Sequence, residues 1–208
     1  MPPAVKFTKE EIVNAALQVV RNKGAAALTT RQIAAELGVS TRPIFTYFQN
    51  MQQVQEAVRQ AAQNLYHSYI QKGMTQEHPF AGVGEQYIRF AMDEPELYRL
   101  LFLSAAPGST SWAAEEMQRT QDMVLDSIRQ IYRMDEETAK RYFRDVWLVT
   151  HSLASLIVTK SCPYTLEEIR TILASVSISI CKACKEIPGF AANRMDRDAL
   201  FHALIEKE

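Results

Sequence analysis

The side chains best suited to recognition chemistry in this chain are hydroxyls and an arginine on one short predicted helix. Within segment 41–48, Ile44 and Phe48 are one helical turn apart and are expected to be buried on the same face. Ser40 or Thr41 can cap this helix at its start. The opposite face then exposes Thr41, Arg42, Thr46 and Tyr47. Hydroxyl and guanidinium groups donate to phosphates and base edges, so this face is typical of a helix that enters the major groove of DNA.

A preceding helix, over residues 29–37, is needed to hold that face outward. Thr29 or Thr30 can cap it, and Gln32 three residues after Thr29 completes a capping-box pattern. Its inward side holds Ile33, Ala34 and Leu37. Gly38 allows the helix to end, and Val39 fills the corner between the two helices. The pair is predicted to be a helix-turn-helix.

Composition predicts an all-helical globular chain. The sequence has 208 residues, of which 47 % are hydrophobic and 23 % charged, with seven glycines and few alternating strand-like runs. No hydrophobic leader precedes Phe7, and polar residues interrupt the apolar stretch 146–158, which is too short to cross a bilayer. We expect a cytoplasmic protein without a membrane partner.

Charge is distributed unevenly along the chain. Residues 1–50 carry six basic and three acidic side chains, a net charge of +3, whereas the whole chain has a net charge of −1. A basic N-terminal part on an acidic remainder is compatible with contact to phosphates.

Helical patterning predicts the order of the remaining elements. We expect a capped helix over 8–23, a long connecting helix from about 50 to 71, and a loop over 72–84. Further helices are expected over about 85–92, 95–103, 111–132, 136–160 and 165–185. Residues 106–109 are expected to interrupt the helical pattern, and a short helix is expected after residue 192. The inward face of the connecting helix is predicted to hold Val54, Ala57, Val58, Ala61, Leu65 and Tyr69. Two domains follow: residues 1–50 for DNA binding and 51–208 for ligand binding and dimerisation.

Residues 8–51 as a whole resemble the N-terminal DNA-binding domain of the TetR family of transcriptional regulators. The resemblance is carried by Ile12-x-x-Ala15-Ala16, Gly24, Leu28-Thr29, Ile33-Ala34, Leu37-Gly38-Val39-Ser40, Ile44 and Tyr47-Phe48-Gln49-Asn50. It implies a homodimer whose two heads read the halves of a palindromic double-stranded DNA operator. It also implies a body that binds a small-molecule effector, usually with repression that the effector relieves, and neither catalysis nor a cofactor.

The resemblance also implies roles for individual residues. Phosphate contacts are expected from Lys6, Thr30 and Tyr47, and base contacts from Arg31, Thr41 and Arg42, with Ser40 and Pro43 beside them at the start of the recognition helix. Two positions depart from the family pattern. Phe45 stands where tyrosine is common and Met51 where lysine is common. Two contacts to the DNA backbone that the family pattern provides are therefore missing here.

The C-terminal part resembles one large group of the same family. The matching segments are Tyr87–Ala91, Glu94–Phe102 and Trp147-x-x-x-His151, where Ser152 replaces the usual glycine. Effector-pocket candidates are Tyr98, Phe102, Trp112, Met117, Trp147 and His151. Taken singly, residues of these types are more often ordinary core residues than ligand contacts. His151 is the first to test, because a neutral imidazole can hydrogen-bond a ligand.

The last two long helices are predicted to form the dimer interface. Their apolar faces hold Phe143, Val146, Trp147, Thr150, Leu153, Ala154 and Ile157, then Ile169, Ile172, Leu173, Val176 and Ile180. The alternative is that these faces belong to the core of a single chain.

Other readings remain open at this stage. Cys181 and Cys184 are either a thiol sensor or half a metal site, or two small residues packed on a helix face. A DNA-binding adaptor controlled by a protein partner is the main alternative function. An all-helical enzyme is a second alternative, although we find no nucleophile elbow, zinc-ligand spacing or phosphate loop.

Overall fold

The structure is a computed structural model that describes residues 7–104, 112–192 and 194–205. Throughout these ranges the regular secondary structure is helical, as predicted. The elements are α1 (Lys9–Lys23), the 3-10 turn η1 (Ala25–Ala27), α2 (Thr30–Leu37), α3 (Arg42–Tyr47), α4 (Met51–Met74), α5 (Pro79–Asp93), α6 (Pro95–Tyr98), the π-helical turn η2 (Arg99–Leu103), α7 (Trp112–Tyr132), α8 (Glu136–Val158), α9 (Leu166–Glu186) and α10 (Arg197–Ile205).

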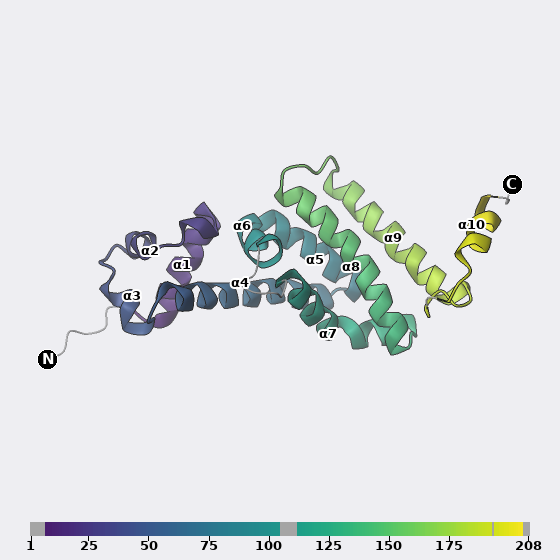
Figure 1. Cartoon of the computed structure of the whole chain (residues 1–208), viewed down its shortest axis with the longest axis horizontal. Coiled ribbons are helices and arrows are strands. Elements are labelled where there is room, and N and C mark those ends of the chain that lie inside the picture. The colour runs from purple at the N-terminus through teal and green to yellow at the C-terminus, as the bar shows by residue number, and fades with distance from the viewer. Residues whose placement is uncertain (1–6, 105–111, 193, 206–208) are drawn as a thin grey trace.

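The molecule is elongated, with a small head at one end and a larger body (Figure 1). We call residues 7–50 the head and residues 51–205 the body. The head packs α1, α2 and α3 around a common core that includes Ile12, Ile33 and Ile44. Helix α1 is capped as predicted, and Thr8 and Glu11 form a capping box at its start.

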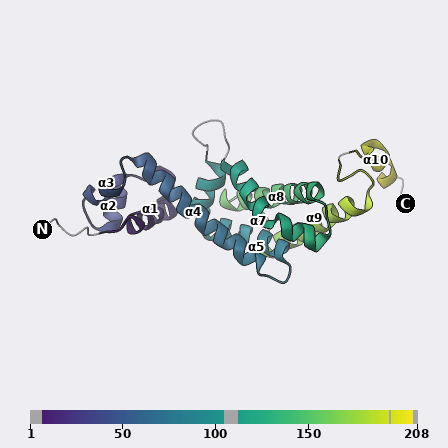
Figure 2. The same cartoon turned by 90° about the horizontal axis from the view of Figure 1, so that it is seen from below.

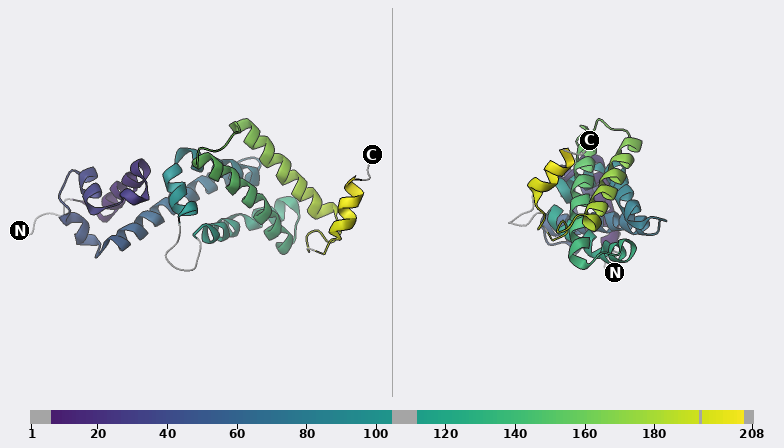
Figure 3. Two further views of the ribbon diagram at one scale, coloured as in Figure 1. Left: turned by 45° about the horizontal axis from the view of Figure 1, so that its top comes forward. Right: turned by 90° about the vertical axis from the view of Figure 1, so that its right-hand side faces the viewer.

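Helix α4 starts at the end of the head and runs into the body (Figures 1 and 3). Asn50 caps it by accepting a hydrogen bond from the backbone N–H of Gln53. The predicted inward face does pack against the core, but it is not the most deeply buried strip of the helix. Val54 and Val58 are buried, but Ala57, Ala61, Leu65 and Tyr69 are only half-buried, and the fully buried positions continue instead through Ala62, Tyr66 and Ile70. Helix α5 packs along α4, and α7 also contacts it, so the body buries a strip with four-residue spacing.

The predicted loop over 72–84 was also wrong. Helix α4 continues to Met74 and α5 begins at Pro79, so only four residues connect them. Gly73 and Gly82 serve helix packing here. A Cβ on Gly73 would lie 2.6 Å from the backbone nitrogen of Val83, so the two helices approach closely because these residues have no side chains.

The later helices follow the prediction closely. Segment 95–103 forms α6 and then the π-helical turn η2. Asp135 caps α8, and Thr165 with Glu168 forms a capping box on α9. The predicted break at 106–109 lies outside the described residues. No helix in the described ranges is long and apolar enough to cross a membrane.

The predicted interface face on α8 is buried inside the chain. Phe143, Val146, Trp147, Thr150, Leu153 and Ala154 all belong to the core or its polar neighbours, because α5 and α7 cover this side of α8. The monomer-core alternative therefore holds for these residues. Leu148 and Leu156 are exposed on another side of α8.

Helix α9 lies on the outside of the body, with α10 beyond it (Figures 1 and 2). Its only buried residue is Ile169, and Ile172, Leu173, Val176 and Ile180 are half-buried. Ile178 is 66 % exposed. Ile172, Leu173 and Ile180 pack against the core of the body, so among the large apolar side chains of this helix Ile178 is the one that the described residues leave exposed.

Candidate functional site

Helix α3 is held on the head by two buried anchors. Ile44 and Phe48 are buried beneath it, as their spacing predicts. Gly38 adopts a left-handed conformation with φ of +67°, which ends α2. The backbone N–H of Val39 then donates to the carbonyl of Ala34 over 2.9 Å, which fixes the turn between the helices.

The outward face of the head carries the predicted recognition residues. Ser40, Thr41, Arg42 and Tyr47 are exposed on or just before α3, and Arg31 is exposed on α2, while Thr30 and Pro43 are half-buried. Neither Arg31 nor Arg42 forms an ion pair with any described residue. Their charges are therefore available to a polyanion. Lys6 lies outside the described residues.

Two predicted caps differ in detail. Thr29 accepts from the backbone N–H of Gln32 over 3.2 Å, but the Gln32 side chain accepts from Lys23, so the capping box is only half formed. Thr41 occupies the cap position of α3 without a side-chain capping bond, because its backbone is already helical. Its exposed hydroxyl therefore remains available to a partner.

Tyr47 has an intramolecular partner that the sequence did not indicate. Its hydroxyl donates to the backbone carbonyl of Phe7 over 3.0 Å, which ties the start of the described chain to α3. A hydroxyl has one proton to donate, so Tyr47 cannot also donate to a phosphate in this arrangement. Its phosphate contact remains a prediction that requires this bond to open.

Phe45 is a candidate contact that sequence reasoning missed. Its side chain is 52 % exposed in the middle of α3. The signal was present, because Phe45 lies between buried Ile44 and exposed Thr46 and cannot share the face of Ile44. An exposed aromatic ring on such a helix can contact a thymine methyl group.

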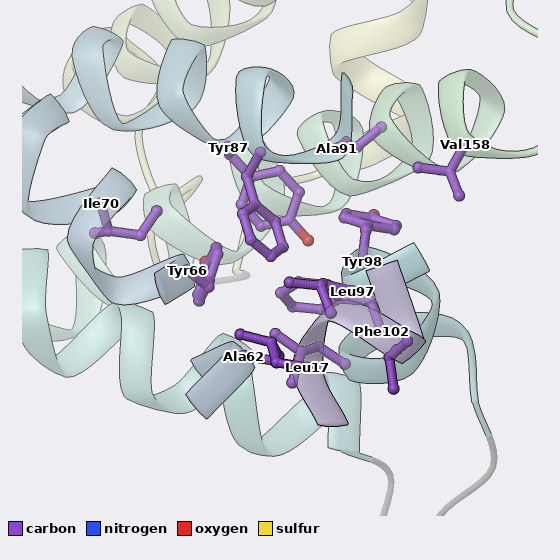
Figure 4. Packing of buried hydrophobic residues seen from close by; sticks show 14 of the residues in the cluster. Leu17, Ala62, Tyr66, Ile70, Tyr87, Ala91, Leu97, Tyr98, Phe102 and Val158 are labelled. Atoms are coloured by element: carbon purple, nitrogen blue, oxygen red, sulfur yellow. The ribbon is translucent and has the colours of Figure 1, made fainter. Parts of the chain in front are cut away.

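The body holds a closed aromatic cluster around His151. Figure 4 shows the rings of Tyr66, Tyr87, Tyr98 and Phe102 turned toward one another. The hydroxyls of Tyr87 and Tyr98 lie 3.0 and 2.9 Å from Nδ1 of His151. The indole of Trp147 stacks on the imidazole with ring centres 4.7 Å apart. We call these six residues the aromatic cluster.

Burial sets the protonation state of this cluster. It lowers the pKa of His151 from its ordinary value of 6.5, so the imidazole is neutral at physiological pH. It also raises the pKa values of Tyr66 and Tyr87, which keeps both hydroxyls neutral. The cavity beside Tyr87 and Trp147 has a volume of about 30 Å³, room for one water molecule.

Four of the six predicted pocket residues meet in this cluster. Tyr98, Phe102, Trp147 and His151 lie together, and Tyr66 and Tyr87 are additions that the sequence did not indicate. Trp112 lies elsewhere, with the guanidinium of Arg59 over its ring. Met117 is half-buried against the core on α7.

A buried carboxyl group lies next to the aromatic cluster. Glu116 is fully buried, and its oxygens lie 2.5 Å from Nε2 of Gln63 and 3.1 Å from Nε2 of His67. Thr120, one turn later on α7, hydrogen-bonds the hydroxyl of Tyr66 over 2.8 Å. The sequence signal was an acidic residue in register with the apolar stripe of α7, one and two turns before Thr120 and Val124.

The cysteines are half-buried and free. Cys181 and Cys184 lie one turn apart on α9, and burial raises the pKa of Cys184. A raised pKa disfavours the reactive thiolate, which favours the packing reading. Across the described ranges no group of three or more His, Cys, Asp or Glu side chains could hold a metal ion.

Comparison with family models places both parts of the chain in one group. Residues 12–58 match the model of bacterial regulatory proteins of the tetR family. Residues 80–174 match the model of the tetracyclin repressor-like C-terminal domain. The two matches cover most of the head, the start of α4 and most of the body. No curated protein matches the chain significantly.

Solved structures share the fold at low sequence identity. A protein of unknown function from Rhodococcus sp. RHA1 is 18 % identical, with a TM-score of 0.68 over 88 % of this chain and 98 % of that one. A TetR-family member from Streptomyces coelicolor A3 is 21 % identical, with a TM-score of 0.59 over 80 % and 96 % of the two chains. The multidrug binding protein EbrR complexed with imidazole is 19 % identical, with a TM-score of 0.53 over 80 % and 88 %.

Proposed function

Because the chain belongs to the TetR family and is therefore a DNA-binding transcriptional regulator rather than an enzyme, we propose that it is a ligand-responsive repressor. Residues 1–50 bind a palindromic operator in this proposal, and residues 51–208 bind the effector and a second copy of the chain. Ligand entry into the body displaces α4 and changes the distance between two recognition helices.

The exposed face of α3 is the observation that supports this proposal most. Arg42 is exposed and has no ion-pair partner among the described residues. It follows Thr41, whose hydroxyl makes no capping hydrogen bond to α3. A guanidinium fork of this kind reads guanine with two hydrogen bonds. The proposed DNA contacts are Lys6, Thr30, Arg31, Ser40, Thr41, Arg42, Pro43 and Tyr47, to which we add Phe45.

We propose a homodimer formed through α8 and α9. The supporting features are three exposed apolar side chains, Ile178 on α9 and Leu148 and Leu156 on α8. A surface repeated on both subunits can be self-complementary across a two-fold axis. The face of α8 that we first expected here is internal, so the proposed contact uses its outer side.

The aromatic cluster is the proposed effector region of the body. Tyr66 belongs to α4 and contacts Tyr87, Phe90 and Phe102 through ring edges. A ligand that separates these rings therefore acts directly on the helix that leads to the head. The EbrR neighbour is described as a multidrug binding protein, which supports a small-molecule role for this fold by analogy.

Control by a protein partner is the second candidate function. The small cavity at the aromatic cluster favours it, because a ligand must open the cluster to enter. Exposed Phe201, Leu204 and Ile205 on α10 favour it as well. The test measures the operator affinity of the purified chain after a small molecule or a protein extract is added. An affinity that changes with small molecules but not with the protein extract would exclude this alternative.

Selection of bound duplexes from a random DNA pool tests the function. We expect a palindrome, and repeating the selection with Arg42→Ala should reduce its information content equally in both halves. Arg129→Ala, on the far surface of α7, is the matched control and should leave the selected sequence unchanged. A sequence-indifferent or non-palindromic pool would contradict the proposal.

A further inference from the structure

A groove of about 450 Å³ lies where the head meets the body, separate from the DNA-contact face and from the aromatic cluster. Its walls come from three places in the chain. The head contributes Ala25 and Leu28, the first turns of α4 contribute Glu56 and Arg59, and the body contributes Leu100 and Trp112. Its volume lies in the range of sites that hold small organic ligands.

Arg59 is the polar centre of this groove. Its side chain is only 11 % exposed, and the guanidinium carbon lies 5.1 Å from the centre of the Trp112 ring. Nε and Nη2 each lie 3.3 Å from an oxygen of Glu56. Nη1 is buried and has no hydrogen-bond partner among the described residues. A buried donor without an acceptor is costly, so this guanidinium still has hydrogen-bonding capacity for a further anionic partner.

The partner that Arg59 now has is easily displaced. The Glu56 side chain is 62 % exposed, and its two contacts with Arg59 are long for charge-assisted hydrogen bonds. Glu56 can therefore turn into water when a stronger acceptor arrives. Apart from these two residues, the described walls of the groove carry no ionisable side chain, so the site can accept one negative group and is otherwise apolar or neutral.

We propose that this groove binds a small aromatic carboxylate. The ligand ring packs against Trp112 and Leu100, and the carboxylate accepts hydrogen bonds from Arg59 in place of Glu56. Arg59 already stacks on an aromatic face, so a planar ligand beside Trp112 extends an existing arrangement.

The position of the groove gives such a ligand a regulatory effect, an inference that rests on the proposed function. A molecule that touches Ala25 and Leu28 on one side and Arg59 and Leu100 on the other fixes the head against the body. Fixing that arrangement changes operator affinity, and operator DNA must change ligand affinity by the same factor.

Calorimetric titration of the full-length chain with 2-naphthoate tests the site without DNA. We expect binding to 2-naphthoate and at least about tenfold weaker binding to uncharged 2-naphthamide. Arg59→Gln should weaken naphthoate binding by about tenfold, whereas Glu56→Gln should strengthen it by removing the competing carboxylate. Arg89→Gln removes a similar surface ion pair on α5 and should change nothing. Equal affinity for acid and amide, or indifference to both Arg59 and Glu56, would overturn the proposal.

A matched pair of head variants tests whether the ligand bridges the two parts. Ala25 lines the groove and its exposed neighbour Ala26 does not. Ala25→Phe should fill the groove and abolish naphthoate binding, whereas Ala26→Phe should leave it intact. Retained binding in Ala25→Phe would refute the bridging site. Naphthoate binding without any selected DNA would leave the site in place and reject only the proposed function.

Discussion

At the scale of single residues, the hydroxyl of Thr41 is the sharpest test of the DNA-contact face. Thr41→Ala should weaken binding to the selected duplex by about 1 kcal/mol, because it removes one neutral hydrogen bond. Thr46→Ala is the matched control, since the Thr46 hydroxyl already donates to the carbonyl of Arg42. Fluorescence anisotropy at fixed salt measures both. Unchanged affinity in Thr41→Ala would place Thr41 outside the interface.

His151 gives a prediction with a defined sign. Burial lowers its pKa from 6.5, so as pH falls below 6.5 the unfolded chain gains a proton that the folded chain does not. The free energy of unfolding should therefore fall over this range and level off below the lowered pKa. His151→Gln should remove this part of the pH dependence. Urea unfolding at pH 7.5 and 5.5 measures the difference, and an unchanged difference in the variant would contradict the neutral, buried imidazole.

Residue-scale features were predictable where they depended on neighbours in sequence. The capping boxes of Thr8 and Thr165 and the burial of Ile44 and Phe48 follow from spacing alone. Contacts between distant residues did not follow. The hydrogen bond from Tyr47 to Phe7 and the buried hydrogen bond from Gln63 to Glu116 depend on how the helices pack, which no local pattern encodes.

At the scale of elements, the crossing of α4 and α5 depends on two glycines. Gly73→Ala should lower the free energy of unfolding by about 1–3 kcal/mol, because its Cβ meets the backbone of α5. Gly84→Ala is the matched control, with nothing within 4 Å of its Cβ, and should be neutral or stabilising by up to about 1 kcal/mol. Urea unfolding compares them. An equal response would mean that the close approach does not govern stability.

The same glycines explain why the 72–84 loop was predicted wrongly. Gly, Pro and Gly in one segment are typical of a loop, but here Gly73 and Gly82 allow two helices to touch and Pro79 occupies the first turn of α5. Helix packing reverses the local preference. Long helices with strong caps, such as α8 and α9, were predicted to within two residues at each end.

At the scale of the whole molecule, head and body are joined by α4 and by an ion pair. The guanidinium of Arg21 on α1 contacts both oxygens of Glu94, which precedes α6. The head was predictable because its fold depends on short, regular signals. The arrangement of head and body was not, because it depends on contacts between parts more than seventy residues apart.

Dimerisation belongs to this scale as well. Ile178→Arg should convert the proposed dimer to a monomer and weaken operator binding, because it places a charge in an apolar interface. Ile131→Arg, on the exposed side of α7, is the matched control and should remain dimeric. Sedimentation equilibrium measures the mass of each. A dimer that survives Ile178→Arg would move the interface away from α9.

The most direct test of the central claim is a hydroxyl-radical footprint on the selected duplex. If two α3 helices per dimer read DNA, two protected patches should lie on one face of the duplex, about 10 base pairs or a whole multiple of that apart. Arg42→Ala should weaken both patches equally. A single patch, or two patches on opposite faces of the duplex, would contradict the account.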